Sequence, residues 1–232
     1  MFEEEDMIPG AELADNTNQR TPCVLLLDCS GSMANNGNIS RLNEGIVKFG
    51  EDLRDDTIAR RRVQVAIVRF GGTEATTASD WVDAASFKAP ELTADGMTPM
   101  GMAVDLGLKM IEERKQLYKE YGIPYTRPWL FLLSDGEPTD IGWEESAKRC
   151  NEAETEKKVL VWPIGVQGAN MKTLAAFKAP DADGQQQIHS LEAVKFVELF
   201  QWLSASLSRT SQGTIGSRVE ILIPPTTMLV ET

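Results

Sequence analysis

Short apolar runs that alternate with amphipathic segments limit the folds open to this chain more than any other feature. Residues 21–27 (TPCVLLL), 129–134 (WLFLLS) and 159–164 (VLVWPI) are apolar almost throughout, as expected of strands that are buried on both faces. Segments with apolar residues at helical spacing lie between these runs, at 41–58, 99–120 and 141–158. Because a sheet buried on both faces needs helices on each side, the sequence predicts an α/β fold, a doubly wound Rossmann-like sandwich with a mostly parallel central sheet.

The remaining elements have weaker patterns. Residues 63–70 (VQVAIVRF) alternate and end at Gly71 and Gly72, which predicts a strand, and residues 76–82 are expected to pair with it as an antiparallel edge strand. A short helix is expected at 171–177, a weak strand at 186–190 and a last helix at 191–207. The predicted apolar face of that last helix carries Leu191, Val194, Val197, Phe200 and Leu203, while Phe196 and Trp202 lie off it.

One globular domain is expected from a length of 232 residues, of which 42% are hydrophobic, because a chain of this size buries a sufficient core. Residues 1–20, rich in Glu, Asp and Asn, are predicted to form a flexible acidic arm before a domain at 21–210. Residues 211–232 form a tail in which 218–223 could add a strand or lie over the last helix.

The charge balance argues against two classes of partner. The chain has 23 Lys and Arg against 35 Asp and Glu, a net charge of −12, which repels nucleic acid and anionic membranes. It begins MFEEEDMIPG, which is unlike a basic signal peptide, and no apolar run approaches the about 18 residues that span a bilayer. We therefore expect a cytoplasmic protein without a nucleic-acid or membrane partner.

Cysteine and histidine are too few for two other kinds of site. The chain has three cysteines, Cys23, Cys29 and Cys150, and a single histidine, His189. The number and spacing of these residues argue against both a disulfide framework and a Cys/His zinc site. The single histidine also leaves little material for acid–base catalysis.

Three loops that follow or lie between the predicted strands carry oxygen-bearing side chains. Asp28, Ser30 and Ser32 come directly after the first apolar run, Thr98 lies in DGMTPMG and Asp135 in SDGEP. Ligands of open α/β sheets bind outside the carboxyl ends of the strands, so we expect these loops to converge. Because they offer only oxygen ligands, they predict a site for Mg²⁺, with Mn²⁺ as a second possibility.

The mixture of hydroxyls and carboxylates also predicts how such a site works. Neutral Ser and Thr oxygens leave a divalent ion electrophilic, and an octahedral ion would keep a position open for an anionic visitor. An Asp or Glu carboxylate of a partner protein fits that position. No nucleophile or general base accompanies the loops, so the sequence predicts a binding module and not an enzyme.

Alternatives exist for each residue and for the whole chain. Asp28 and Asp135 could form local turns, and Thr98 before Pro99 is a good helix N-cap. A phosphohydrolase of the haloacid dehalogenase type also places an Asp and Mg²⁺ at the end of its first strand. That class has a second Asp two residues later, where this chain has Ser30. Turn chemistry gives no reason for all three loops to present oxygens together, which favours the metal site.

The motifs DCSGSM, GMTPMG and LLSDGEP together resemble the metal-ion-dependent adhesion site (MIDAS) of von Willebrand factor type A (VWA) domains, whose pattern is DxSxS, then Thr, then Asp. The resemblance covers about residues 22–208. It implies Mg²⁺ held by Ser30, Ser32 and Thr98, with Asp28 and Asp135 close by, often through water.

A second resemblance concerns the stretch RPWLFLLSDGEPTD, which is similar to TerY-type proteins of bacterial tellurium-resistance systems. It implies a role in a stress-response phosphorylation system, with an associated protein kinase and a metal-dependent phosphatase as partners.

Overall fold

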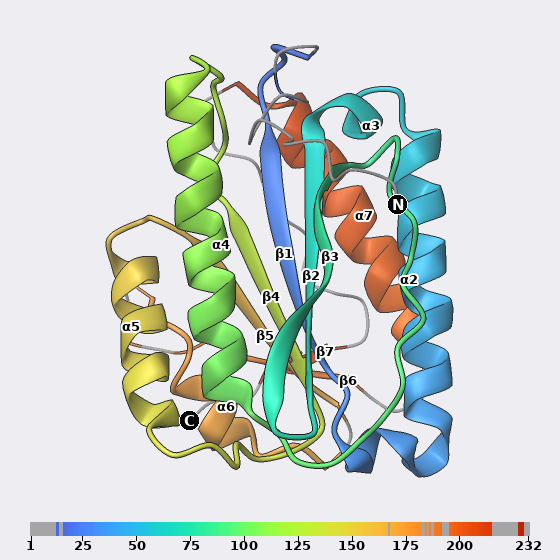
Figure 1. Ribbon diagram of the computed structural model, residues 1–232, viewed down its shortest axis with the longest axis vertical. Coiled ribbons are helices and arrows are strands. Elements are labelled where there is room, and N and C mark those ends of the chain that lie inside the picture. The colour runs from blue at the N-terminus through green and yellow to red at the C-terminus, as the bar shows by residue number, and fades with distance from the viewer. Residues whose placement is uncertain are drawn as a thin grey trace, which may run out of the picture.

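A central sheet of seven strands organises the part of the chain that the structure describes (Figure 1). The computed structural model describes residues 13, 16–166, 168–181, 184, 186, 188–191, 195–214 and 227–229. In spatial order the strands are β3 (Glu74–Asp83), β2 (Val63–Gly71), β1 (Thr21–Asp28), β4 (Trp129–Ser134), β5 (Leu160–Val166), β6 (His189–Leu191) and β7 (Thr227–Leu229).

The strand directions confirm the predicted fold class. Strands β2, β1, β4, β5 and β6 are parallel, and β3 pairs with β2 as the expected antiparallel edge. A further antiparallel strand, β7, pairs with β6 at the opposite edge. The sheet is therefore mostly parallel with an antiparallel strand at each end.

Helices cover both faces of the sheet. One layer contains the 3₁₀ helix η1 (Gly31–Gly37), α2 (Asn38–Asp55), α3 (Ala59–Arg62) and α7 (Phe196–Gln212); the other contains α4 (Met100–Glu120), α5 (Trp143–Thr155) and α6 (Met171–Ala175). In Figure 1, α4 and α5 lie to the left of the sheet, and α2 lies to the right. Within the described residues, no helix is long and apolar enough to cross a membrane.

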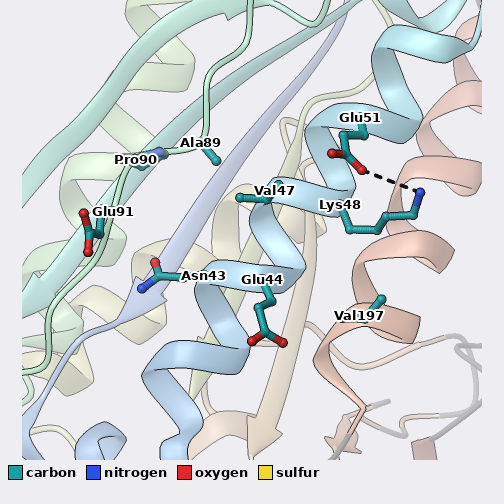
Figure 2. A pocket seen from close by; sticks show the side chains of 9 residues that line it. All are labelled: Asn43, Glu44, Val47, Lys48, Glu51, Ala89, Pro90, Glu91 and Val197. Carbon is teal, nitrogen blue, oxygen red and sulfur yellow. Dashed lines mark ion pairs between the residues drawn. The ribbon is translucent and has the colours of Figure 1, made fainter.

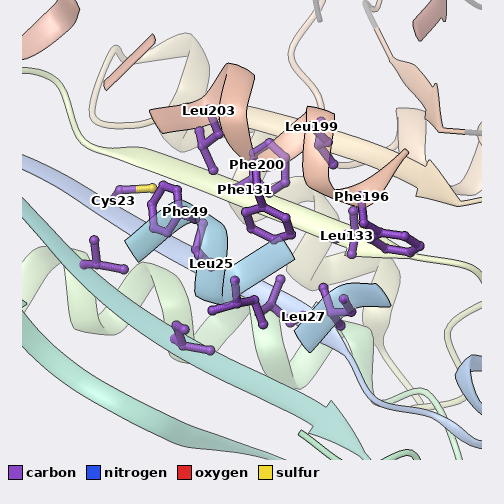
Figure 3. Close-up of a cluster of buried hydrophobic side chains, with 14 of the residues drawn as sticks. Cys23, Leu25, Leu27, Phe49, Phe131, Leu133, Phe196, Leu199, Phe200 and Leu203 are labelled. Carbon is purple, nitrogen blue, oxygen red and sulfur yellow. The ribbon is translucent and has the colours of Figure 1, made fainter. Parts of the chain in front are cut away.

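Strand β1 shows why its residues are apolar throughout. Cys23, Leu25 and Leu27 pack into the core under α2 and α7, while Val24 and Leu26 pack under α4 and α5. Each side chain leaves water completely, because successive residues of a strand point to opposite faces. Figure 3 shows the first of these two clusters.

Aromatic rings and a glycine bring α2 and α7 together. The Phe200 ring lies 5.8 Å from that of Phe49 on α2 and 6.4 Å from that of Phe131 on β4, between ring centroids. A Cβ atom at Gly45 would lie 2.5 Å from the Phe200 ring. The absence of a side chain at Gly45 therefore allows the close approach of the two helices.

The predicted apolar face of the last helix is correct at Phe200 and Leu203 and wrong in its first turns. Leu191 ends β6, Val194 lies outside the described residues, and Val197 is only half-buried. The helix begins at Phe196, and its buried face includes Phe196, Leu199, Phe200, Leu203 and Leu207. Because Leu191 belongs to β6, the helix begins only at Phe196, and its buried face is counted from that residue. Trp202 is also buried, and its ring packs edge-on against that of Trp162 at 5.2 Å between centroids.

The two ends of the chain are described only in part. In the predicted arm, Leu13 is buried beside Tyr118 and Ile123, and Arg20 is buried with its backbone N–H donating to Pro124 O at 2.8 Å. The tail residues 218–223, which could add a strand or lie over the last helix, fall outside the described residues. The division into arm, domain and tail stays a prediction.

Candidate metal centre

Backbone hydrogen bonds join two of the three loops, those that carry Ser30 and Thr98, to each other and to the end of β2. The Asp95 N–H donates to Cys29 O at 2.7 Å, and the Gly72 N–H donates to Asp95 O at 2.6 Å. The Gly31 N–H donates to Gly96 O at 2.9 Å. The loop after β1 is therefore bound to the segment that leads to Thr98, and the end of β2 supports both.

Glycines allow these loops to lie so close. A Cβ atom at Gly71 would be 2.4 Å from Cys29 O, closer than real Cβ contacts. Gly96 has a φ of +60°, and its Cβ would be 2.5 Å from the Gly72 Cα atom. Any side chain at these positions would push the loops apart.

Asp28 is the buried carboxylate of the site. It ends β1 with 0% exposure. Its Oδ1 atom accepts from the Ser30 N–H at 2.7 Å, and its Oδ2 atom accepts from the Ser134 hydroxyl at 2.5 Å. Burial raises the pKa of the Asp28 carboxyl to about 6, while the hydrogen bonds from Ser134 and Ser30 oppose that rise. Asp28 is thus held in place from two strands, β1 and β4.

The two serines and Asp135 form a continuous chain of hydrogen bonds. The Ser32 hydroxyl donates to Asp135 Oδ1 at 2.6 Å, and the Ser30 and Ser32 hydroxyl oxygens are 2.9 Å apart. A hydroxyl has one hydrogen, so Ser30 donates to Ser32 when Ser32 donates to Asp135. In this arrangement the Ser32 hydrogen points toward Asp135 and the Ser30 hydrogen toward Ser32, which leaves at least one lone pair on each oxygen available to a cation.

Thr98 lies next to this chain. A Cβ atom at Gly136 would be 3.4 Å from Thr98 Oγ1 and 3.9 Å from Ser32 Oγ, so both hydroxyls lie beside the Asp135–Gly136 turn. The Thr98 N–H donates to the Thr139 hydroxyl at 2.9 Å, and the Thr139 N–H donates to Thr98 O at 3.0 Å. The structure thus places Asp28, Ser30, Ser32, Thr98 and Asp135 in one group at the end of β1 and β4.

Thr98 does not act as the helix cap that its sequence context favours. Helix α4 begins at Met100, and Asp140 accepts from the N–H groups of Gly101 (3.3 Å) and Met102 (2.9 Å). Asp140 therefore satisfies the free N–H groups of the first turn. Among the described residues, the structure gives the Thr98 hydroxyl no hydrogen-bond partner, so this oxygen is free to bind a ligand.

The donor set fits a hard divalent cation. Three hydroxyls and two carboxylates supply only oxygen, the ligand that Mg²⁺ and Mn²⁺ prefer. No cluster of three or more His, Cys, Asp or Glu side chains suited to a metal occurs in the described part of the chain. Three neutral hydroxyl oxygens would hold the ion, with the two carboxylates beside it, directly or through water.

Two residues that support the site were not predicted from the sequence. Ser134 ends the apolar run of β4, and a small polar residue at this position indicates only the end of a strand. In the structure, however, its hydroxyl donates to Asp28. Asp140 caps α4 from a different loop. Both contacts join segments far apart in the sequence, and no local pattern indicates them.

A mostly parallel α/β sheet with hydroxyls and carboxylates gathered at the ends of β1 and β4 defines a class of ligand-binding domain. This chain belongs to the von Willebrand factor type A domain family, whose family model matches residues 23–201. No protein with a curated description matches the sequence. Domains of this family are typically non-enzymatic interaction modules.

Three solved structures illustrate the same fold. The pilus adhesin SpaC of Lactobacillus rhamnosus GG is 13% identical with a TM-score of 0.65, and the match covers 84% of this chain and 31% of that chain. Proximal thread matrix protein 1 of the mussel byssus, in a form with a zinc-occupied MIDAS motif, is 16% identical with a TM-score of 0.53 over 84% and 47%. Manganese-loaded TRAP of Plasmodium vivax is 15% identical with a TM-score of 0.51 over 93% and 77%.

These likenesses establish the fold. The chain spans about half the length of the mussel protein and less than a third of the pilus adhesin. Divalent metals, zinc and manganese, occur in two of these structures.

Proposed function

We propose that this protein is a metal-dependent interaction module that binds one Mg²⁺ or Mn²⁺ ion and docks an acidic residue of a partner protein. Ser30, Ser32 and Thr98 would hold the ion, with Asp28 and Asp135 beside it, directly or through water. The observation that carries the proposal is the group of three hydroxyl oxygens near the buried Asp28, with the Ser32 hydroxyl bound to both Ser30 and Asp135.

Each residue has a separate task in this proposal. Asp28 is fixed by Ser134 and by the Ser30 N–H, so its carboxylate cannot swing toward solvent. Asp135 accepts the hydrogen of Ser32 and thereby orients the serine oxygens. When bound, the ion supplies an electrophilic coordination position, which a carboxylate of the partner fills. Direct coordination demands correct geometry, whereas an exposed ion pair in water contributes only about 0–1 kcal/mol.

We propose that the protein is not an enzyme. His189 is 2% exposed and stacks on Trp162 at 5.5 Å between ring centroids, so it is not placed to exchange protons with a substrate. Ser30 occupies the position of the second Asp in haloacid dehalogenase motifs, and a hydroxyl is a poor acid or base near neutral pH. These features support binding over phosphate-ester hydrolysis.

We also propose a cytoplasmic adaptor role with Mg²⁺ as the cellular metal. The three cysteines are buried free thiols, in keeping with a reducing compartment. The similarity of residues 127–140 to TerY-type proteins supports a place in a bacterial tellurium-resistance or stress-response phosphorylation system. The associated protein kinase and metal-dependent phosphatase of such a system are the partners to test first.

Metal binding tests the site itself. Wild-type protein titrated with Mn²⁺ in a calorimeter should bind about one ion per chain, and Ser30→Ala/Ser32→Ala should weaken binding by about tenfold or more because two ligands are lost. The matched control is Ser40→Ala/Ser86→Ala, which removes two exposed hydroxyls away from the site. Unchanged affinity in Ser30→Ala/Ser32→Ala, with an unchanged far-ultraviolet dichroism spectrum, would contradict the ligand set.

Partner binding tests the adaptor role. The candidate kinase and phosphatase are each incubated with the protein in Mg²⁺, in chelator, and with Thr98→Ala. Binding should require Mg²⁺ and the Thr98 hydroxyl. Binding that persists equally in all three conditions would show that another surface docks the partner.

A further inference from the structure

A groove lies beside α2, on the helix layer that contains α7 (Figure 2). Its walls are the stretch of α2 from Asn43 to Glu51, the segment 89–91, and Val197 in the first turn of α7. The volume is about 500 Å³, within the range of sites that bind ligands. None of the proposed metal ligands lines it.

The groove has an apolar floor. Val47 is 49% exposed, although Leu42, Ile46, Phe49 and Leu53 of the same helix are buried. Figure 2 shows Val47 and Ala89 pointing toward one another from opposite walls. Pro90 and Val197 extend this apolar surface. Covering the exposed Val47 and its apolar neighbours with an apolar side chain of a ligand would be favourable, because it removes apolar surface from water.

One wall offers free backbone groups. The Asn43 side chain holds the segment beside α2, because its Nδ2 atom donates to Leu92 O at 2.8 Å and its Oδ1 atom accepts from the Leu92 N–H at 2.9 Å. In contrast, the backbone groups of Ala89 and Glu91 make no hydrogen bond to any described residue. Such an ordered segment with open N–H and C=O groups can pair with an extended peptide.

The rim of the groove is acidic. Glu44, Glu51 and Glu91 are exposed at its edges. Lys48 lies among them, but its ammonium is 2.8 Å from a carboxylate oxygen of Asp52, outside the groove, and 3.8 Å from one of Glu51. Three carboxylates therefore face one lysine that is already paired, and the rim favours a positively charged ligand.

We propose that this groove binds a short extended segment of a partner protein in which Lys or Arg residues alternate with apolar residues. The apolar side chains would lie between Val47 and Ala89, and the basic side chains would reach Glu44, Glu51 and Glu91. The eight-residue rise from Asn43 to Glu51 is about 12 Å, which matches about four residues of an extended peptide. The net charge of −12 attracts such a segment at long range.

This interaction is independent of the proposed metal function, which requires an acidic partner residue at a different surface. The test therefore runs in chelator. A displayed library of random peptides of about ten residues is selected on the wild-type protein and on Val47→Lys, which fills the groove and adds a repelling charge. The wild type should enrich sequences with interleaved basic and apolar residues, and Val47→Lys should not.

One enriched peptide is then labelled, and its affinity is measured by fluorescence anisotropy. Glu44→Gln/Glu51→Gln/Glu91→Gln should weaken binding by about tenfold or more, because the charge pairs of the rim are lost. Glu120→Gln/Glu144→Gln/Glu152→Gln is the matched control, with the same net charge but exposed positions on α4 and α5; its affinity should stay within about twofold of wild type.

Three results would overturn the proposal: no enrichment on the wild type, enrichment of acidic or purely polar sequences, or equal loss of affinity in the two triple variants. Sedimentation velocity gives a further check. A dimer of the wild type that Val47→Lys dissociates would identify a second copy of this chain as the occupant instead.

Discussion

Replacement of Gly71 by alanine should separate the loops that build the candidate metal centre. The new Cβ atom would lie 2.4 Å from Cys29 O, 2.8 Å from Cys29 C and 3.1 Å from Asp95 O. All three neighbours are backbone atoms, so no flexible side chain can move aside. Ordinary contact begins at 3.4 Å, and the Cys29 backbone must therefore move by about 1 Å from the end of β2.

The expected loss of stability follows from the hydrogen bonds that this movement breaks. Asp95 N–H to Cys29 O (2.7 Å) and Gly72 N–H to Asp95 O (2.6 Å) both cross the gap that would widen. Losing two such bonds costs about 1 kcal/mol each, and the residual overpacking adds about 1–2 kcal/mol, for a total of about 3–4 kcal/mol. Because Cys29 lies between Asp28 and Ser30, Mn²⁺ affinity should also fall, by about tenfold or more.

Urea unfolding followed by circular dichroism measures the first effect, and calorimetric titration with Mn²⁺ measures the second. Gly37→Ala is the control: its φ is +70°, but nothing lies within 4 Å of the added Cβ. That variant should lose only about 1 kcal/mol from backbone strain and keep its metal affinity. Equal losses of stability in Gly71→Ala and Gly37→Ala, with Mn²⁺ affinity retained in both, would refute the reasoning.

Two further predictions concern pH. Metal binding requires ionised Asp28, whose pKa of about 6 in the metal-free protein means that Mn²⁺ affinity measured by calorimetry should fall by about tenfold from pH 7 to pH 5; a flat affinity over this interval would argue against a role for Asp28. Burial, with the Lys178 charge, lowers the pKa of His189 to about 4 from 6.5, so the unfolded chain binds a proton that the folded protein refuses. Neutral His189 therefore contributes up to about 3 kcal/mol to the free energy of unfolding. This contribution is fully present above pH 6.5 and is lost as the pH falls through about 4. In urea titrations, His189→Gln should show a smaller fall in unfolding free energy from neutral to acidic pH than the wild type; parallel falls would contradict the assignment. Asp28 acts in the opposite sense, since its raised pKa favours the folded state at low pH, but this contribution is common to both proteins and cancels in the comparison.

The fold could be predicted because the apolar composition of its strands indicates that they are buried on both faces. The runs at 21–27 and 129–134 are apolar at every second position on both faces, which only a sheet covered by two helix layers requires. The hairpin of β2 and β3 was equally clear from alternation and from Gly71 and Gly72. In these elements the sequence pattern and the tertiary environment agree.

The last helix shows where periodicity alone fails. Leu191 fits a helical stripe with Val194, but it pairs in β6 opposite Val166 of β5. Strand β6 has three residues, too short to produce a pattern of its own. The sequence is therefore equally compatible with Leu191 in a helix and with Leu191 in a strand, and only the sheet pairing decides between the two.

The candidate site divides in the same way. Asp28, Ser30, Ser32, Thr98 and Asp135 could be named because they follow a motif and because strand ends meet at one edge of the sheet. The roles of the Ser134 hydroxyl and of the Asp140 cap could not be predicted, because each side chain binds a segment that is far away in the sequence. Thr98 is the clearest case: its context favours a helix cap, and only the contact of Asp140 with α4 shows that its hydroxyl is left free.

The strand order explains why the site forms between β1 and β4. From β1 the chain passes to β2 and β3 on one side, and it then returns to β4 on the other side of β1. The loop after β1 leads to η1 and α2 on one face of the sheet, whereas the loop after β4 leads to α5 on the opposite face. The strand order reverses between these two loops, and this is the point at which open α/β sheets bind their ligands. Ser30 and Ser32 come from the first loop and Asp135 from the second, and the Ser134 to Asp28 hydrogen bond joins the ends of β4 and β1. A ligand at this position contacts loops from both halves of the sheet, which is why the site depends on the close approach of their backbones.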